Sequence, residues 1–204
     1  MSSFQSQRKK YSLKKDKFIP LELSRHIIDI MSGSRSESVN GVRLSTYAGM
    51  RVEETTCLKV GRIHFSGGEF GLEYIEIVKG AEGGAKGGRL RTIPILDKEA
   101  QNALKIAVAG KKPKDFIVVT AKGEQMGVDT VSAALCKTLK REYDDDTYKY
   151  NGCHAMRKAW VQRYYDAVRE KCDKKRAIGK TNVVLGHGYN RDASGFKTYV
   201  KNMW

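Results

Sequence analysis

The sequence has few of the features that define disulfide-rich or zinc-binding proteins. It holds three prolines and four cysteines among 204 residues. The cysteines form neither a CxxC pair nor a cluster with histidines at zinc-ligand spacing. Scattered thiols of this kind are usually buried small side chains, so we expect no disulfide framework and no structural metal. The four residues are Cys57, Cys136, Cys153 and Cys172.

Long apolar runs are also missing. No stretch approaches the length of a membrane span, and residues 1–17, which include six lysines and arginines, lack the apolar segment of a secretory signal. We therefore expect a soluble intracellular protein that does not bind a membrane.

Acidic residues are the minority among the charged side chains. Lysine and arginine number 38 against 23 aspartates and glutamates, which gives a formal net charge of +15. Such an excess of positive charge favours a polyanionic partner, and nucleic acid comes first. We expect residues 1–17 to form a basic tail or linker end, and residues 18–204 to form one folded domain.

Hydrophobic periodicity predicts an α+β fold that is mainly helical, with a small antiparallel β-sheet. Lysines and arginines between residues 171 and 180 are expected to form a basic link. Helices are expected at about 21–33, 36–48, 52–58, 97–108, 128–139 and from 152 onward, strands at 60–65, 72–78 and 89–95, and a strand or extended stretch at 116–119.

The C-terminal part carries most of the candidate functional side chains. His154 and Arg157 are three residues apart on a predicted helix, so they share one face. An apolar run broken by a glycine then leads to His187, and Tyr199 follows it. Two histidines, an arginine and a tyrosine in one site can bind and cut a phosphodiester.

This order of motifs, HxxR, then LGH, then a tyrosine, resembles the catalytic domain of the tyrosine recombinase family, the phage-type integrases. Arg51 lies in the segment YAGMRVEE, which is similar to the setting of the family's first arginine. Glu54, one turn later, is expected to brace the backbone or to pair with a base. Lys86 precedes Pro94 by eight residues, a spacing similar to that of the family's lysine in a β-hairpin. The resemblance covers residues 18–199.

The resemblance implies the tyrosine-recombinase catalytic-domain fold over residues 18–204, without the N-terminal core-binding domain of many integrases. It also implies a site-specific DNA recombinase that works through a 3′-phosphotyrosyl intermediate, with no metal or other cofactor. The partner would be double-stranded DNA, bound by a homotetramer whose subunits are monomeric when free. Such a protein would be cytoplasmic and nucleoid-associated, and encoded by a bacterium, an archaeon or a phage.

The same resemblance implies a role for each of the candidate residues. Tyr199 would attack phosphorus, and His154 would accept its proton as the general base. Lys86 would act as the general acid toward the leaving 5′ oxygen. The residues expected to bind the phosphate are Arg51, Arg157 and His187.

Alternatives for single residues stay open. Lys79 is a second candidate for the hairpin lysine. Tyr189 is a second candidate for the nucleophile, because the interval from His187 to Tyr199 is longer than is usual in the family. Cys153 is a weaker candidate nucleophile. The aspartates at 144–146 favour a solvated turn over a magnesium site, since successive residues do not converge on one ion.

Two other functions would use the same fold. A type IB topoisomerase-like enzyme relaxes DNA with a similar set of residues, and relaxation of supercoils without Holliday junctions would identify it. A catalytically silent DNA-binding accessory protein would form no covalent adduct with DNA.

Overall fold

The computed structural model describes residues 19–34, 36–66, 73–78, 90–143, 152–189 and 199–200. The predicted basic tail, residues 1–17, lies outside these ranges. The helices are α2 (Leu21–Gly33), α3 (Val39–Tyr47), α4 (Val52–Cys57), η1 (Val60–Arg62, 3-10), α5 (Lys98–Val108), α6 (Val128–Tyr143), α8 (Gly152–Arg169) and α9 (Lys174–Val184). The strands are β1 (Ile63–His64), β2 (Tyr74–Ile77) and β3 (Arg91–Pro94). A mainly helical α+β fold with a small antiparallel sheet is thereby confirmed.

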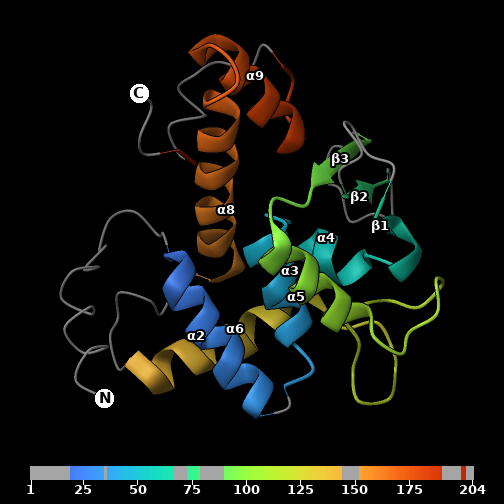
Figure 1. Cartoon of the computed structure of the whole chain (residues 1–204). Coiled ribbons are helices and arrows are strands. Elements are labelled where there is room, and N and C mark those ends of the chain that lie inside the picture. Colours follow the sequence, from blue (N-terminus) through green and yellow to red (C-terminus); the bar gives the residue numbers. More distant parts are fainter. Residues whose placement is uncertain are drawn as a thin grey trace.

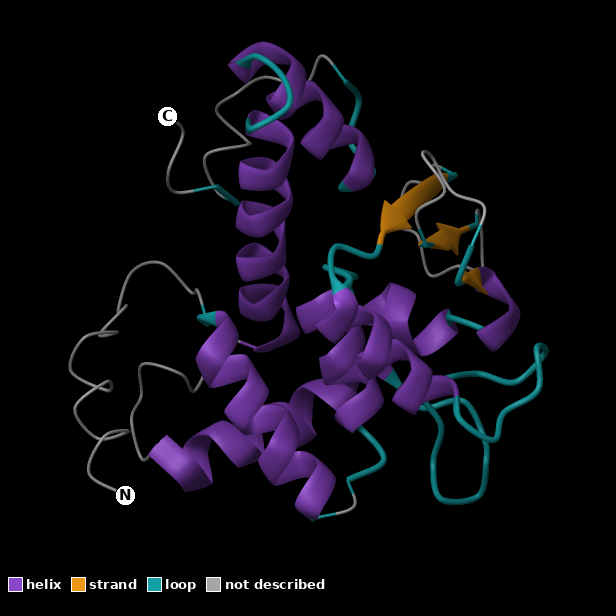
Figure 2. Ribbon diagram, viewed as in Figure 1, coloured by secondary structure: helices purple, strands orange, loops and turns teal. Residues whose placement is uncertain are grey.

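The long helix α8 runs from the group of helices that includes α2, α3 and α6 to α9 (Figure 1). It packs against α2, α3 and α6 and also against α9. The three-stranded sheet lies to the side of the helices, as the orange arrows in Figure 2 show, and β3 contacts α9. Residues from α3, α8, α9 and β3 can therefore meet, although the sequence separates them widely.

The core forms because several helices present apolar side chains at helical spacing. In α2 the buried residues include Leu23, Ile27 and Met31, each one turn from the next. The helix α5 starts where the Asp97 side chain accepts a hydrogen bond from the Ala100 backbone N–H at 2.8 Å. Trp160 and Tyr165 of α8 are among the largest fully buried side chains of the core.

The sheet has the order β1-β2-β3, with both pairs antiparallel. Ile75 of β2 lies opposite Ile63 of β1 and Ile93 of β3, and all three are buried. Alternation along β3 places Arg91 on the same inward face as Ile93. The sheet therefore turns an arginine as well as a row of isoleucines toward the interior.

Three segments differ from the sequence prediction. Residues 60–65, predicted as a strand, form η1 followed by the two-residue strand β1. The predicted basic link is largely the helix α9, which Asp173 caps by accepting from the Arg176 backbone N–H at 3.0 Å. Its apolar periodicity is faint because the buried positions include Gly179 and Thr181. In addition, α6 extends to residue 143, beyond the predicted end at 139.

Gly49 lets α8 approach the end of α3 closely. Its φ is +58°, and a Cβ built there would lie 2.2 Å from Cε3 of Trp160. No side chain fits in that space without moving the indole, so a glycine is required both for the backbone conformation and for the packing.

Among the described residues, the structure contains no helix with the combination of length and apolar character that crossing a membrane requires.

We predict that Gly49→Ala lowers the free energy of unfolding by about 2 kcal/mol or more, because the methyl group would displace Trp160 and the positive φ would be strained. Gly33→Ala is the control, since a Cβ at Gly33 meets nothing within 4 Å, and its effect should stay within about 1 kcal/mol. Urea unfolding of both variants measures the difference. Equal stability of Gly49→Ala and wild type would contradict the packing described.

Candidate active site

Arg51 lies at the junction between α3 and α4. It is extended, with φ −69° and ψ 151°, immediately before α4 begins. The Glu54 carboxylate accepts one hydrogen bond from the Arg51 backbone N–H at 2.9 Å and another from Arg51 Nη1 at 3.0 Å. The prediction that Glu54 braces this backbone is therefore confirmed. About a quarter of the Arg51 side chain, 24%, is exposed, unlike the buried side chains of Arg91 and Arg157.

Arg157 and His154 differ in exposure although both lie in the first turns of α8. Arg157 is 1% exposed. Its Nη1 donates to the Gly49 carbonyl, and its Nη2 donates to the Leu185 carbonyl at 3.2 Å. His154 is exposed. Arg157 thus ties α8 both to the junction before α4 and to the segment that follows α9.

His187 follows a tight turn at the end of α9. Gly186 has a φ of +81°, a conformation that favours glycine just after a helix. The His187 backbone N–H donates to the Asn182 carbonyl at 2.8 Å. The LGH motif is therefore a helix end that fixes the point from which the histidine projects.

The Tyr199 ring lies close to both candidate histidines. Its ring centroid is 5.5 Å from that of His154, in an edge-to-face arrangement, and 5.9 Å from that of His187. Tyr199 also interacts electrostatically with Arg157. Residues from α8, from the turn after α9 and from near the end of the sequence are therefore brought together around one phenol.

The Glu54 carboxylate joins three arginines. Its side chain is fully buried and contacts Arg91 Nη2 at 2.5 Å, Arg51 Nη1 at 3.0 Å and Arg157 Nη1 at 3.7 Å. Burial acts to raise the pKa of Glu54, but the charges of Arg91 and Arg157 and the hydrogen bonds from Arg91 and the Arg51 backbone hold it below its ordinary value. One ionised carboxylate therefore fixes three guanidinium groups.

Two pKa shifts describe the electrostatics around Tyr199. Although His154 keeps part of its surface exposed, partial desolvation and the charges of Arg157, Lys158 and Arg51 lower its pKa. Its imidazole is therefore neutral at neutral pH and can accept a proton. Burial lowers the pKa of Arg157 to about 10, against the opposing charge of Glu54. Arg157 therefore still carries its positive charge at neutral pH.

Arg91 is the residue of this cluster that sequence reasoning missed. Its Nε donates to the Val184 carbonyl at 2.8 Å, while its Nη2 holds Glu54. The available signal was the alternation of β3, in which Arg91 occupies an inward position two residues before Ile93. An arginine at such a position needs a buried partner.

The structure describes two of the alternative candidate nucleophiles, Cys153 and Tyr189. Cys153 is 3% exposed, and burial raises the pKa of its thiol to about 11, which opposes a role as a nucleophile. The ring of Tyr189 covers Gly179 of α9, where a Cβ would lie 2.4 Å from the tyrosine Cζ. Lys86, Lys79 and the aspartates at 144–146 lie outside the described residues.

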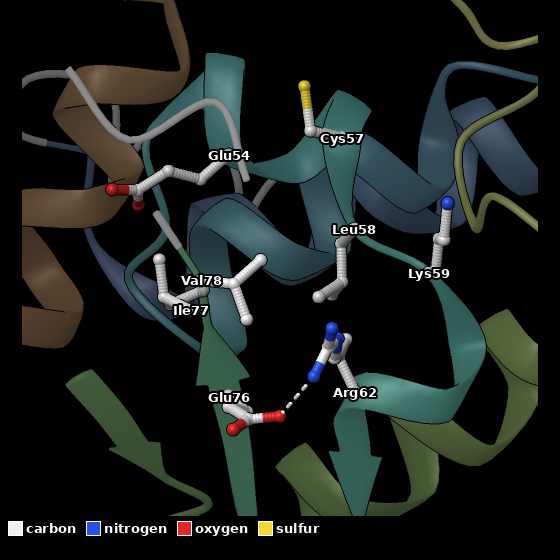
Figure 3. Close-up of a pocket in the computed structure, with 8 residues that line it drawn as sticks. All are labelled: Glu54, Cys57, Leu58, Lys59, Arg62, Glu76, Ile77 and Val78. Carbon is white, nitrogen blue, oxygen red and sulfur yellow. Dashed lines mark hydrogen bonds and ion pairs between the residues drawn. The ribbon is translucent and has the colours of Figure 1, made fainter. Parts of the chain in front are cut away.

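A pocket lies where α4 and the segment after it meet η1 and the strand β2. Figure 3 shows that the Glu54 carboxylate extends away from Arg62 and Glu76, which form an ion pair at 2.7 Å across this pocket. Arg51, His154, Arg157, His187 and Tyr199, the predicted catalytic residues that the structure describes, do not line it. Its lining residues are Glu54, Cys57, Leu58, Lys59, Arg62, Glu76, Ile77 and Val78.

Within the described part of the chain, no group of three or more His, Cys, Asp or Glu side chains is arranged to hold a metal ion. The neighbours of Tyr199 are two imidazoles and the positive charge of Arg157, and a guanidinium suits a phosphate oxygen.

Comparisons with known proteins identify one family, and several solved structures are similar to this chain, two of which are described here. The model of the phage integrase family matches residues 22–177. The crystal structure of XerA recombinase is similar with a TM-score of 0.59 and 17% identity, over 89% of this chain and 59% of that chain. The Tn1549 transposon integrase, solved in complex with circular intermediate DNA, is similar with a TM-score of 0.58 and 15% identity, over 91% of this chain and 61% of that one.

The chain thus spans about three fifths of the length of both solved proteins. No curated protein matches it closely enough to count as a relative. The likeness to the two structures confirms the fold that the sequence predicted.

We predict that Glu54→Gln lowers the free energy of unfolding at neutral pH by roughly 3 kcal/mol, because it leaves buried arginine charges uncompensated. Since the pKa of Glu54 is below 4.5 in the folded protein, its contribution is present above that pH and is lost as the pH falls through the lowered value. The difference between variant and wild type should therefore shrink only in acid.

Urea unfolding at several pH values measures this difference. Glu76→Gln is the control, because Glu76 is 37% exposed in its ion pair with Arg62 and its loss should change stability by at most about 1 kcal/mol. If both variants lose the same stability at neutral pH, the Glu54 carboxylate does not hold the cluster.

Proposed function

This chain belongs to the phage integrase family, and on that premise we propose that it is a site-specific DNA recombinase that cuts and rejoins DNA through a 3′-phosphotyrosyl intermediate. The observation that supports this most is the position of Tyr199, whose ring lies within 6 Å of both His154 and His187, measured between ring centroids as 5.5 and 5.9 Å. A phenol that has two imidazoles and the Arg157 charge as neighbours suits attack on a phosphodiester.

The proposed reaction begins when the Tyr199 oxygen attacks phosphorus. His154, whose lowered pKa keeps it neutral, accepts the phenolic proton. A bond forms between the tyrosine oxygen and phosphorus, and the bond from phosphorus to the 5′ oxygen breaks. Lys86 donates a proton to that oxygen, which leaves as a 5′-hydroxyl. The new phosphate ester conserves the bond energy, so a different 5′-hydroxyl can reverse the step and no metal or other cofactor is required.

Charge builds on the non-bridging oxygens as the transition state forms, and three residues are proposed to stabilise it. Arg51 offers a partly exposed guanidinium. Arg157 contributes a buried positive charge next to Tyr199, in a site where low polarity strengthens the interaction. His187 adds a hydrogen bond from the turn after α9. The pairing of both arginines with Glu54 supports this role, because it orients them before DNA arrives.

Double-stranded DNA is the proposed partner. The net charge of +15 favours binding to phosphates, and affinity should fall steeply with salt. Exchange of strands between two duplexes requires two cuts in each, so we propose that four copies of the chain assemble on paired sites.

We predict that wild-type protein forms a covalent adduct with nicked duplex DNA and that Tyr199→Phe forms none, because only the phenol supplies the attacking oxygen. A pool of nicked duplexes of randomised sequence serves as the probe, and denaturing gels detect the adduct. Tyr189→Phe is the matched control and should react like wild type, since Tyr189 packs on Gly179 through its ring. An adduct that persists in Tyr199→Phe, or none with wild type, would refute the proposal.

We also predict that the adduct rate falls as the pH drops below 6.5, the ordinary value for histidine, because the lowered pKa of His154 keeps the base neutral until the solution is acidic. His154→Asn should lose roughly a hundredfold in rate and this acid limb together. Single-turnover rates at saturating protein, measured across pH, provide the check. An unchanged acid limb in His154→Asn would assign the titration to another group.

A further inference from the structure

Arg91 is a buried charged group that the proposed chemistry does not use directly. Its side chain is 2% exposed, so it does not face a ligand in solution. It comes from the inward face of β3, where its neighbour two residues on is the buried Ile93. A charge at such a place is costly unless it is fully partnered, and its partners indicate what it does.

The guanidinium of Arg91 makes two different contacts. Its Nη2 donates to Glu54 Oε1 at 2.5 Å, and its Nε donates to the Val184 carbonyl at 2.8 Å. The first contact reaches the carboxylate that also pairs with Arg51 and Arg157. The second reaches the last residue of α9, directly before the turn that carries His187.

The turn itself lies against the same guanidinium. A Cβ added at Gly186 would be 3.1 Å from Arg91 Nη1 and 3.6 Å from Arg51 Nη1. Gly186 therefore allows the backbone before His187 to rest beside two arginines. Movement of Arg91 would shift both the turn and Glu54.

We propose that Arg91 is a positioning residue, which sets Arg51 and Arg157 through Glu54 and sets His187 through the end of α9. The proposal rests on the proposed recombinase function and concerns the same site. Arg91 touches no substrate; it acts by holding the groups that do. It also ties the strand that follows the Lys86 segment to the arginine cluster, because β3 begins at Arg91.

Arginine suits this task because its planar fork serves two acceptors at fixed angles. Lysine keeps the charge but cannot span the Glu54 carboxylate and the Val184 carbonyl with the same geometry. Methionine fills part of the volume and serves neither acceptor. Arg51 and Arg157 still compensate the Glu54 charge when Arg91 is replaced. Removing one partner of a buried ion pair also lowers stability, so the test has to separate the effect on geometry from the effect on stability.

The test compares Arg91→Met and Arg91→Lys with wild type in single-turnover adduct formation on the pool of nicked duplexes. Arg91→Met should form adduct about a hundredfold more slowly, the effect of a misplaced catalytic constellation, while its affinity for DNA in fluorescence anisotropy stays close to that of wild type. Arg91→Lys should recover part of the lost rate. Arg25→Met is the matched control, because it breaks the Arg25–Glu99 pair between α2 and α5, and it should react like wild type.

A second substrate separates positioning from a general loss of stability. In this substrate a methylphosphonate replaces the scissile phosphate next to the nick, so that a neutral methyl group stands in place of one charged non-bridging oxygen. Less negative charge then develops in the transition state, and stabilisation by Arg51 and Arg157 contributes less to the rate. The ratio of wild-type to variant rates should therefore be smaller on the methylphosphonate. A merely unstable variant would show the same ratio on both substrates. If Arg91→Met does not fold, the same comparison with Arg91→Lys decides.

The outcomes distinguish this proposal from the function on which it rests. Wild-type protein without any adduct would remove the recombinase function and this proposal with it. Adduct with wild type and an equal rate with Arg91→Met would overturn the proposal for Arg91 alone. An equal ratio on the two substrates would also overturn it.

Discussion

The arrangement of the site depends on one buried carboxylate. Glu54 has no exposed side-chain surface and is held by Arg51, Arg91 and Arg157, which come from the start of α4, from β3 and from α8. Three like charges near each other would repel in a medium of low polarity. The carboxylate offsets part of that repulsion and fixes the direction of each guanidinium. Three guanidinium groups against one carboxylate leave the cluster with a net positive charge.

Packing at the α3–α4 junction serves the same arrangement. The close approach of Trp160 to Gly49 brings α8 against the end of α3, and Arg157, one turn before Trp160, then reaches the Gly49 carbonyl. The turn at Gly186, which precedes His187, rests against the guanidinium groups of Arg91 and Arg51. Core packing and site geometry are therefore not separable here, because the same close contacts determine both.

The sequence predicted much of this because the main signals are local. Helical spacing identified α2, α5 and α8, and the HxxR and LGH motifs identified residues that the structure brings near Tyr199. Sequence reasoning missed α9, whose buried face is built from small and polar residues, and Arg91, whose partners are 37 and 93 residues away in the chain. The alternation of β3 could have placed Arg91 on the inward face, but its partners, far away in the sequence, could be recognised only once the fold was known.

The central proposal, that the Tyr199 phenol attacks DNA, can be tested by identifying which tyrosine is covalently linked to DNA in the adduct. Trypsin cleaves after lysine and arginine, so it separates Tyr199, in the peptide 198–201, from Tyr189, in the peptide 181–191. Mass spectrometry of the digested DNA adduct should place the nucleotide on the peptide 198–201. A nucleotide on the peptide 181–191, or on any other part of the chain, would contradict the account.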